Sequence, residues 1–75
     1  MKITYDKNAD AIYIYLNSEK QGVSGWVKKT YMCDVDEVGG IINMDFDENN
    51  YLSGIEVLDA SKKLSKDFID KAENL

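Results

Sequence analysis

The sequence predicts an α+β domain in which an antiparallel β-meander of four to five strands carries one C-terminal α-helix packed on the sheet. Over about residues 2–58, β-branched and aromatic residues alternate with polar ones, which is the period of a half-buried strand. Over about residues 60–74, apolar residues instead recur at helical spacing. With 75 residues, the chain is expected to form a single small domain over 1–75.

The first two predicted strands are "KITY" and "AIYIYL", which flank the turn-rich joint "DKNAD". Pairing Tyr5 with Ile12 brings the apolar residues of both strands to one face, namely Ile3, Tyr5, Ile12, Ile14 and Leu16. The opposite face then receives Thr4, Tyr13 and Tyr15.

The middle of the chain predicts a polar loop over residues 17–22, "NSEKQG". One or two further strands are expected over residues 23–37, with a bulge or bend at Gly25. The run "VGG" over residues 38–40 ends this part of the sheet.

A second hairpin is predicted around "ENN", with Asn49 and Asn50 at the two central turn positions, because asparagine tolerates positive φ. The expected pairs are Ile42 with Val57, Met44 with Ile55, and Phe46 with Ser53. This register gathers the apolar residues of both strands on one face, as a half-buried antiparallel pair requires. A slip by one residue would mix them with polar residues, so the pattern selects its own pairing.

The tail changes to a helical period, with apolar residues at Ala60, Leu64, Phe68, Ile69, Ala72 and Leu75. Asp59, Ser61 or Ser65 can cap the start of the predicted helix. We expect its apolar stripe to close the apolar face of the sheet.

The composition excludes several kinds of chemistry. The chain has no histidine and no proline, and all nine of its basic residues are lysines. It therefore lacks the commonest general base and metal ligand, and it lacks the guanidinium fork that reads phosphate or guanine. Cys33 is the single cysteine, so it has no disulfide partner within the chain and no histidine to activate it. We predict a protein that is not an enzyme and uses no cofactor.

The acidic residues are concentrated in the middle of the chain. Between Lys29 and Lys62 there are eight acids and no lysine, while the rest of the chain carries nine lysines and six acids, which gives −8 against +3 and a net charge of −5. We call residues 34–59 the acidic block. It is either a solvated sheet face that discourages aggregation or a surface for a basic partner. Direct nucleic-acid binding is disfavoured by the net charge.

Nine residues are candidates for contact with a partner. Six are acids of the acidic block, namely Asp34, Asp36, Glu37, Asp45, Asp47 and Glu56. Three are aromatic residues expected away from the apolar face or beside a glycine, namely Tyr13, Tyr15 and Trp26. Because a chain this short has little core, self-association is also expected, with a dimer favoured.

The stretch "DFDENNYLSGIE" also matches the ligand spacing of a calcium loop. The candidate side-chain ligands are Asp45, Asp47, Asn49 and Glu56. Asn50 stands where such a loop has glycine, and the flanks "GGIINM" and "VLDA" are strand-like where amphipathic helices are needed. The hairpin explains more of these residues than calcium does.

Two segments with their spacing, "YDKNADAIYIYL" (5–16) and "DVDEVGGIINMDFDENNYLSGIEVLDASKKL" (34–64), resemble the prokaryotic and phage family catalogued as domain of unknown function 2283. The matching positions are Tyr5, Asp6, Ala9, Asp10, Tyr13, Asp45, Gly54, Glu56, Asp59, Ala60 and Ser61. The resemblance implies a compact antiparallel sheet with a C-terminal helix and no established activity. Because some members lie beside genes for small toxin-like proteins, it also implies an antitoxin-like partner role.

This chain departs from the family pattern in three ways. It has "ENN" where a turn glycine is usual, it has an inserted-looking "GVSGWVKKTYM", and it lacks the arginines often present near the first hairpin and "DAS". Any contact that those arginines make in other members is in doubt here.

The leading hypothesis is a small acidic, non-enzymatic and self-associating protein that binds a basic protein partner, either as an antitoxin-like protein or as a phage-type inhibitor of a nucleic-acid-binding protein. One alternative is a small-ligand or divalent-cation binding domain that uses Asp45, Asp47 and Glu56. Another is a purely structural oligomer subunit. With no long apolar run and no signal-like start, the protein is expected to be cytoplasmic and to have no contact with a membrane.

Overall fold

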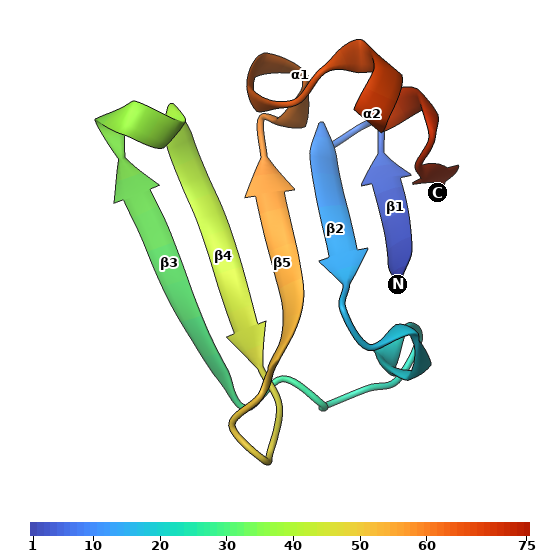
Figure 1. Ribbon diagram of the computed structural model, residues 1–75, viewed down its shortest axis with the longest axis vertical. Coiled ribbons are helices and arrows are strands. Elements are labelled where there is room, and N and C mark those ends of the chain that lie inside the picture. Colours follow the sequence, from blue (N-terminus) through green and yellow to red (C-terminus); the bar gives the residue numbers. More distant parts are fainter.

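The computed structural model describes residues 1–75, except for the side chains of Val35 and Val38. A six-stranded sheet runs through the described chain in the order β3–β4–β5–β2–β1–β6 (Figure 1). The strands are β1 (Lys2–Asp6), β2 (Ala11–Tyr15), β3 (Lys29–Val35), β4 (Gly40–Phe46), β5 (Leu52–Leu58) and β6 (Glu73–Asn74). The helices are α1 (Ala60–Lys63) and α2 (Lys66–Asp70), and 3-10 turns span Ser18–Lys20 and Asp36–Val38. The predicted α+β class is confirmed.

The sheet is not the simple meander that the sequence predicts. The first hairpin adds to the far side of β5, so that β2 pairs with β5 and not with β3, its neighbour in sequence. Residues 23–28, where the sequence predicts part of a strand, form turns and irregular backbone, with Gly25 at φ 76°. This connection is long enough to carry the chain past β5 to the opposite edge of the sheet (Figure 1).

Both predicted strand registers hold in their central parts. In the first hairpin Tyr5 pairs with Ile12, as predicted. In the second, Ile42 pairs with Val57 and Met44 with Ile55. The predicted pairing of Phe46 with Ser53 is wrong, because the register shifts after Asp45 and Phe46 pairs with Leu52. A β-bulge of this kind adds one residue to one strand and leaves no clear signal in an alternating sequence.

The turn of the second hairpin also differs from the prediction. Only Asn50 has positive φ, at 66°, while Asn49 does not. The Asn50 N–H donates to the Asp47 carbonyl at 2.9 Å, and the Asp47 N–H donates to the Tyr51 carbonyl at 3.0 Å. The turn therefore has three loop residues, with the last in the left-handed conformation.

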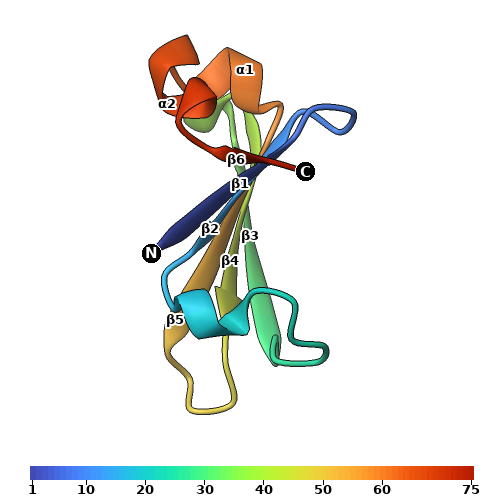
Figure 2. The same ribbon diagram turned by 90° about the vertical axis from the view of Figure 1, so that its right-hand side faces the viewer.

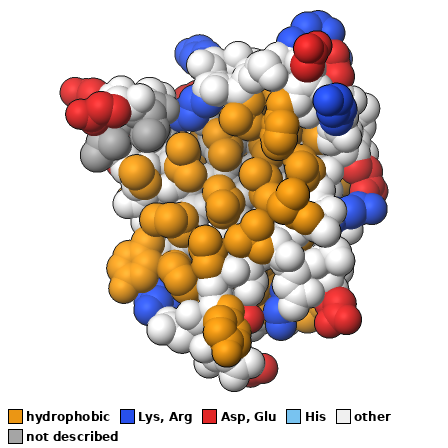
Figure 3. Space-filling view, viewed as in Figure 1, with side chains coloured by type: hydrophobic (Ala, Val, Ile, Leu, Met, Phe, Trp, Pro, Cys, Tyr) orange, Lys and Arg blue, Asp and Glu red, His pale blue; other side chains and the backbone are white. Residues whose placement is uncertain are grey.

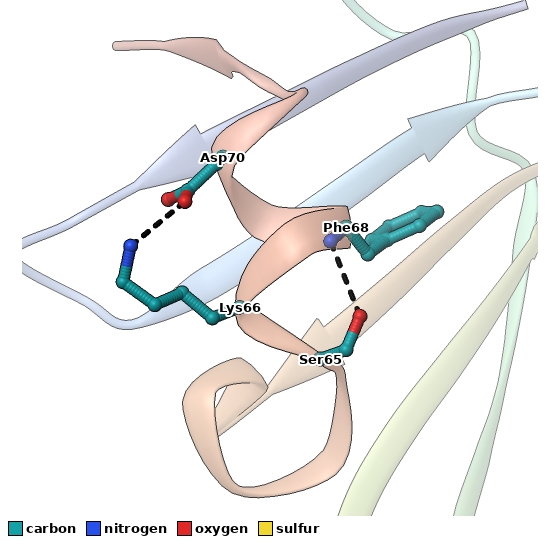
Figure 4. A network of polar contacts seen from close by, with 4 residues as sticks. All are labelled: Ser65, Lys66, Phe68 and Asp70. Carbon is teal, nitrogen blue, oxygen red and sulfur yellow. Dashed lines mark hydrogen bonds and ion pairs between the residues drawn. The ribbon is translucent and has the colours of Figure 1, made fainter.

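The single predicted helix is divided at Leu64 and Ser65, which have extended backbone. Ser65 caps α2, because its Oγ accepts a hydrogen bond from the Phe68 N–H at 3.2 Å (Figure 4). Lys66 and Asp70 pair across one turn of α2 at 2.8 Å. Serine is a better cap than interior helix residue, so the chain starts a second helix here. After α2 the chain adds β6 to the sheet, parallel to β1.

The two helices lie together at one end of the sheet (Figures 1 and 2). Leu64, Phe68 and Ile69 from this tail pack against the core. Among the described side chains, the buried apolar ones are few, namely Ile12, Val57, Ala60 and Ala72. The molecule measures 33 × 27 × 18 Å, so it is thin in one direction. The helices therefore close only part of the apolar face.

Candidate binding surfaces

Apolar residues cross the sheet in two rows on one face. The row nearest the helices pairs Ile12 with Val57, Val57 with Ile42, and Ile42 with Cys33. It contains the fully buried Ile12 and the nearly buried Val57. The helices cover this row, because Leu64, Phe68 and Ile69 pack against the same buried cluster.

The second row lies one step farther from the helices and ranges from half-buried to exposed. It pairs Ile3 with Ile14, Ile14 with Ile55, Ile55 with Met44, and Met44 with Tyr31. None of these side chains is buried, and Tyr31 is 53% exposed. We define the open apolar face as Ile3, Ile14, Ile55, Met44 and Tyr31 together with Phe46, whose ring meets that of Tyr31 edge-on at 5.6 Å. Figure 3 shows a continuous apolar surface over the strands.

The open apolar face has a cation at its border and no acid among its members. The Lys29 ammonium lies 5.1 Å from the centre of the Tyr31 ring and 5.2 Å from that of the Phe46 ring. An ammonium over aromatic rings is held by their quadrupoles, so Lys29 stays beside the apolar surface.

The opposite face of the sheet is built around the buried carboxylate of Asp45, which is 8% exposed. Tyr13 donates its hydroxyl to Asp45 Oδ2 at 2.5 Å, and Thr30 donates to Oδ1 at 2.5 Å. Burial, followed by the hydrogen bond to Asp45, raises the pKa of Tyr13 well above its ordinary value. Both Asp45 oxygens are thus engaged within the sheet, and this predicted partner-contact residue is part of the internal structure.

The predicted aromatic contact residues gather on this same face. The Tyr13 and Tyr15 rings lie 4.5 Å apart. A Cβ added at Gly54 would lie 2.2 Å from the Tyr13 hydroxyl and 2.9 Å from Trp26, so both rings occupy the space that glycine leaves. All three aromatic side chains are partly buried. Trp26 belongs to the connection between β2 and β3, and its ring covers the sheet at Gly54.

Asp47 organises the second turn and is 8% exposed. Its Oδ1 accepts hydrogen bonds from the N–H groups of Asn49 and Tyr51 at 2.9 and 3.1 Å, and its Oδ2 accepts one from the Ser53 hydroxyl at 3.0 Å. The Tyr51 N–H, followed by the Ser53 hydroxyl, holds the pKa of Asp47 below its ordinary value. Residues of this stretch that match the ligand positions of a calcium loop are therefore used to build a hairpin turn.

The candidate calcium ligands do not converge. Asp45 and Asp47 bind protein donors with both of their oxygens, and Glu56 Oε1 accepts a hydrogen bond from the Asn43 amide at 3.0 Å. Asn49 enters the network through its backbone N–H. In the part of the chain that the structure describes, no three His, Cys, Asp or Glu residues are grouped so as to hold a metal ion.

The remaining predicted contact acids, Asp34, Asp36 and Glu37, are exposed where β3 ends. Figure 3 shows acidic side chains at the corresponding corner of the molecule. The acidic block is therefore divided. These three acids form one exposed group, while Asp45 and Asp47 are buried and Glu56 is half-buried in the sheet.

A second polar network, which the sequence did not predict, joins the first hairpin to helix α1. Asp10 accepts hydrogen bonds from the Tyr5 hydroxyl at 2.8 Å and from the Ser61 hydroxyl and N–H at 2.6 and 3.1 Å. The hydrogen bond from the Ser61 hydroxyl, followed by that from the Tyr5 hydroxyl, lowers the pKa of Asp10. The hydrogen bond between Tyr5 and Asp10 also raises the pKa of Tyr5. The only available signal was that "YDKNAD" and "DAS" belong to the same family pattern.

These features define a small single-sheet α+β protein with one open apolar face and internally satisfied carboxylates. The chain belongs to the family described as protein of unknown function DUF2283, whose model matches residues 2–61, and this confirms the resemblance found in the sequence. It is 40% identical over 75 residues to the uncharacterised protein MJ0789 of Methanocaldococcus jannaschii. The match covers 100% of this chain and 54% of that relative, so the chain spans about half of its length. No solved structure matches the chain.

Within the described residues, no helix is long and apolar enough to cross a bilayer.

Proposed function

We propose that this protein is a non-enzymatic binding module whose open apolar face contacts another protein. The observation that carries the proposal is the row from Ile14 through Ile55 and Met44 to Tyr31, which is apolar across four strands and uncovered by the helices. Contiguous exposed apolar surface on a small protein is typical of an interaction site.

The form of this face favours a macromolecule over a small ligand. Small-molecule sites are concave and enclose most of their ligand. The open apolar face is one side of a sheet in a molecule of 33 × 27 × 18 Å, and the cation of Lys29 lies at its border. A broad apolar surface with a charged rim fits the composition of a protein interface. Among the residues that the structure describes, no converging ligands support the divalent-cation alternative.

A specific observation favours a second contact, with a basic protein. Asp34, Asp36 and Glu37 are exposed within four residues of one another at the end of β3. Three adjacent carboxylates can attract a cationic surface, such as the nucleic-acid groove of a toxin-like protein, in keeping with an antitoxin-like or inhibitor role. This contact lies at the edge of the sheet and is separate from the open apolar face.

The first contact can be tested with a photo-cross-linking amino acid placed at position 31 or at position 32. Tyr31 and Met32 are neighbours on β3, 53% and 62% exposed, and point to opposite faces. A probe at position 31 should form a protein adduct in cells, while a probe at position 32 should form little. Equal adduct yields from the two positions, or none from position 31, would contradict the proposed function.

The second contact can be tested with a short oligolysine peptide as the basic probe. Asp34→Asn, Asp36→Asn and Glu37→Gln together should weaken its binding and reduce the salt dependence. The control is Glu19→Gln, Glu48→Gln and Asp67→Asn together, which removes the same three charges from exposed positions away from the end of β3. Equal losses in the triple variant and the control would assign the binding to net charge alone.

A further inference from the structure

We infer that the open apolar face binds a second copy of this chain, so that two sheets pack face to face. The inference rests on the proposed function, because it names the partner of the same face. Three features of the molecule support it: an incomplete second layer, the available area and the distribution of charge.

The first feature is the missing layer. Stable domains bury the apolar face of a sheet against a second layer of structure. In this molecule the helices pack against the buried cluster that contains Ile12 and Val57, and Ile3, Ile14 and Ile55 are only partly buried beside it. The next row, from Ile14 to Tyr31, has no covering element among the described residues. A second sheet packed at about 10 Å would cover it with side chains of the same kind.

The second feature is the surface area. The accessible surface is 5128 Å² for a mass of 8.5 kDa. The scaling of surface with mass predicts about 4,650 Å² for a compact monomer of this size, so the chain exposes roughly 10% more than expected. The broad side of the molecule measures 33 × 27 Å, and the open apolar face is the part of it that the helices leave free. A standard interface takes ~800 Å² from each partner, so a dimer here would use most of this side.

The third feature is the charge. The chain has a net charge of −5, yet the open apolar face contains no acid. Two copies can therefore meet there without bringing carboxylates together. The net charge of −5 on each copy opposes their association at long range, as it would oppose an anionic lipid surface, and salt screens this repulsion. Pairing through this face therefore depends on its apolar contacts.

Part of the polar face is already occupied by the chain itself. Trp26 and the connection between β2 and β3 lie over Gly54 and Tyr13, and Asp45 is satisfied by Tyr13 and Thr30. A copy that docked there would have to displace these contacts.

Light scattering coupled to size exclusion measures the mass directly. The wild-type chain should have twice the 8.5 kDa of the monomer. Tyr31→Glu should raise the dimer dissociation constant by at least about tenfold, because two carboxylates would enter one apolar interface. Met32→Glu is the matched control, since it puts the same charge on the adjacent, more exposed residue of the opposite face. It should leave the mass at that of the dimer.

Circular dichroism checks that each variant folds. If Tyr31→Glu unfolds, Leu52→Glu replaces it, because Leu52 is 36% exposed and pairs with Phe46 at the border of the same face. A wild-type monomer at all concentrations would overturn the inference, and so would a folded Tyr31→Glu or Leu52→Glu dimer as tight as the wild type. An adduct from position 31 with a different protein, found for a monomeric wild type, would overturn the second copy and still support the proposed function. A monomer without any adduct would overturn both.

Discussion

At the scale of single residues, Gly54 is required by the side chains around it. Its φ is not positive, so its role is spatial: a Cβ there would lie 2.2 Å from the Tyr13 hydroxyl oxygen and 2.8 Å from the carbon that bears it. Gly54→Ala should lower the free energy of unfolding by roughly 1–3 kcal/mol, as overpacking does in other cores. Urea denaturation of the variant measures the loss.

A double-mutant cycle identifies the cause of that loss. Tyr13→Phe removes the nearest atom to the added methyl group, at the cost of a hydrogen bond to Asp45. The two substitutions together should therefore destabilise less than the sum of their separate effects. Strict additivity would show that the Tyr13 hydroxyl is not what excludes a side chain at position 54.

Two carboxylates should make the stability depend on acid pH. The folded state holds the pKa of Asp10 and of Asp47 below the ordinary 3.8, through hydrogen bonds from Ser61 and from the Tyr51 N–H respectively. A group with a depressed folded pKa stabilises the fold at pH values above its unfolded pKa, and this contribution is lost as the pH falls through the folded pKa. The melting temperature of the wild type should therefore fall as the pH drops below about 4.

Substitution by asparagine separates the two contributions. Asp47→Asn and Asp10→Asn should each have a lower melting temperature than the wild type at neutral pH and a shallower decline toward acid pH. Asp67→Asn is the control, because Asp67 is an exposed acid on α2. An acid decline in Asp47→Asn and Asp10→Asn as steep as in the wild type would assign the effect to other groups.

At the scale of elements, the turn between β4 and β5 depends on the conformation of Asn50, whose φ is 66°. Asparagine tolerates this region better than other residues with a side chain, and glycine tolerates it best. Asn50→Ala should therefore lower the free energy of unfolding by about 1 kcal/mol, and Asn50→Gly should equal or exceed the wild type. The hydrogen bond from Lys29 to the Asn50 side chain is exposed and adds little.

The same substitutions at Asn49 provide the comparison. Asn49 does not have positive φ, so Asn49→Gly should destabilise where Asn50→Gly does not. Chemical denaturation of the four variants tests the assignment. If Asn49→Gly were the stabilising change, the left-handed residue of the turn would be wrongly placed.

The sequence predicts those elements in which one local rule acts alone. Alternation of apolar and polar residues places Tyr5 opposite Ile12 and Met44 opposite Ile55, because any slip would expose a whole apolar set. The predicted pairing of Phe46 with Ser53 fails, because the register shifts there. The Ser53 hydroxyl donates a hydrogen bond to the Asp47 side chain instead. The prediction also fails at Ser65, where capping competes with helix continuation. In both cases a polar side chain forms a hydrogen bond with the backbone or with a neighbouring side chain. The apolar periodicity of the sequence carries no information about such hydrogen bonds.

The candidate sites show a similar limit. The acidic block is continuous in sequence, but strand alternation turns Asp45 toward Tyr13 and Thr30 on the polar face, while Asp34 and Asp36 lie at an exposed end. The sequence predicts which residues share the apolar face. It does not predict that the tail helices are too short to cover that face, because their length depends on the break at Leu64 and Ser65.

At the scale of the whole molecule, the small core determines how stability should depend on concentration. Few apolar side chains of the described chain are buried, and the row from Ile14 to Tyr31 is open. If a second copy covers this row, part of the stability comes from association and follows mass action. The melting temperature should then rise by about 3–6 °C for each tenfold increase in protein concentration.

The two β3 variants distinguish this effect from ordinary destabilisation. The melting temperature of Tyr31→Glu should depend less on concentration than that of the wild type, because its dimer dissociates at higher concentrations. Met32→Glu should keep the dependence of the wild type, since Met32 lies on the opposite face of the same strand and is 62% exposed. Calorimetry over about a hundredfold range of concentration measures all three slopes. A flat wild-type slope would mean that the open apolar face contributes no stability through a second copy, and that the monomer is stable with this face in water.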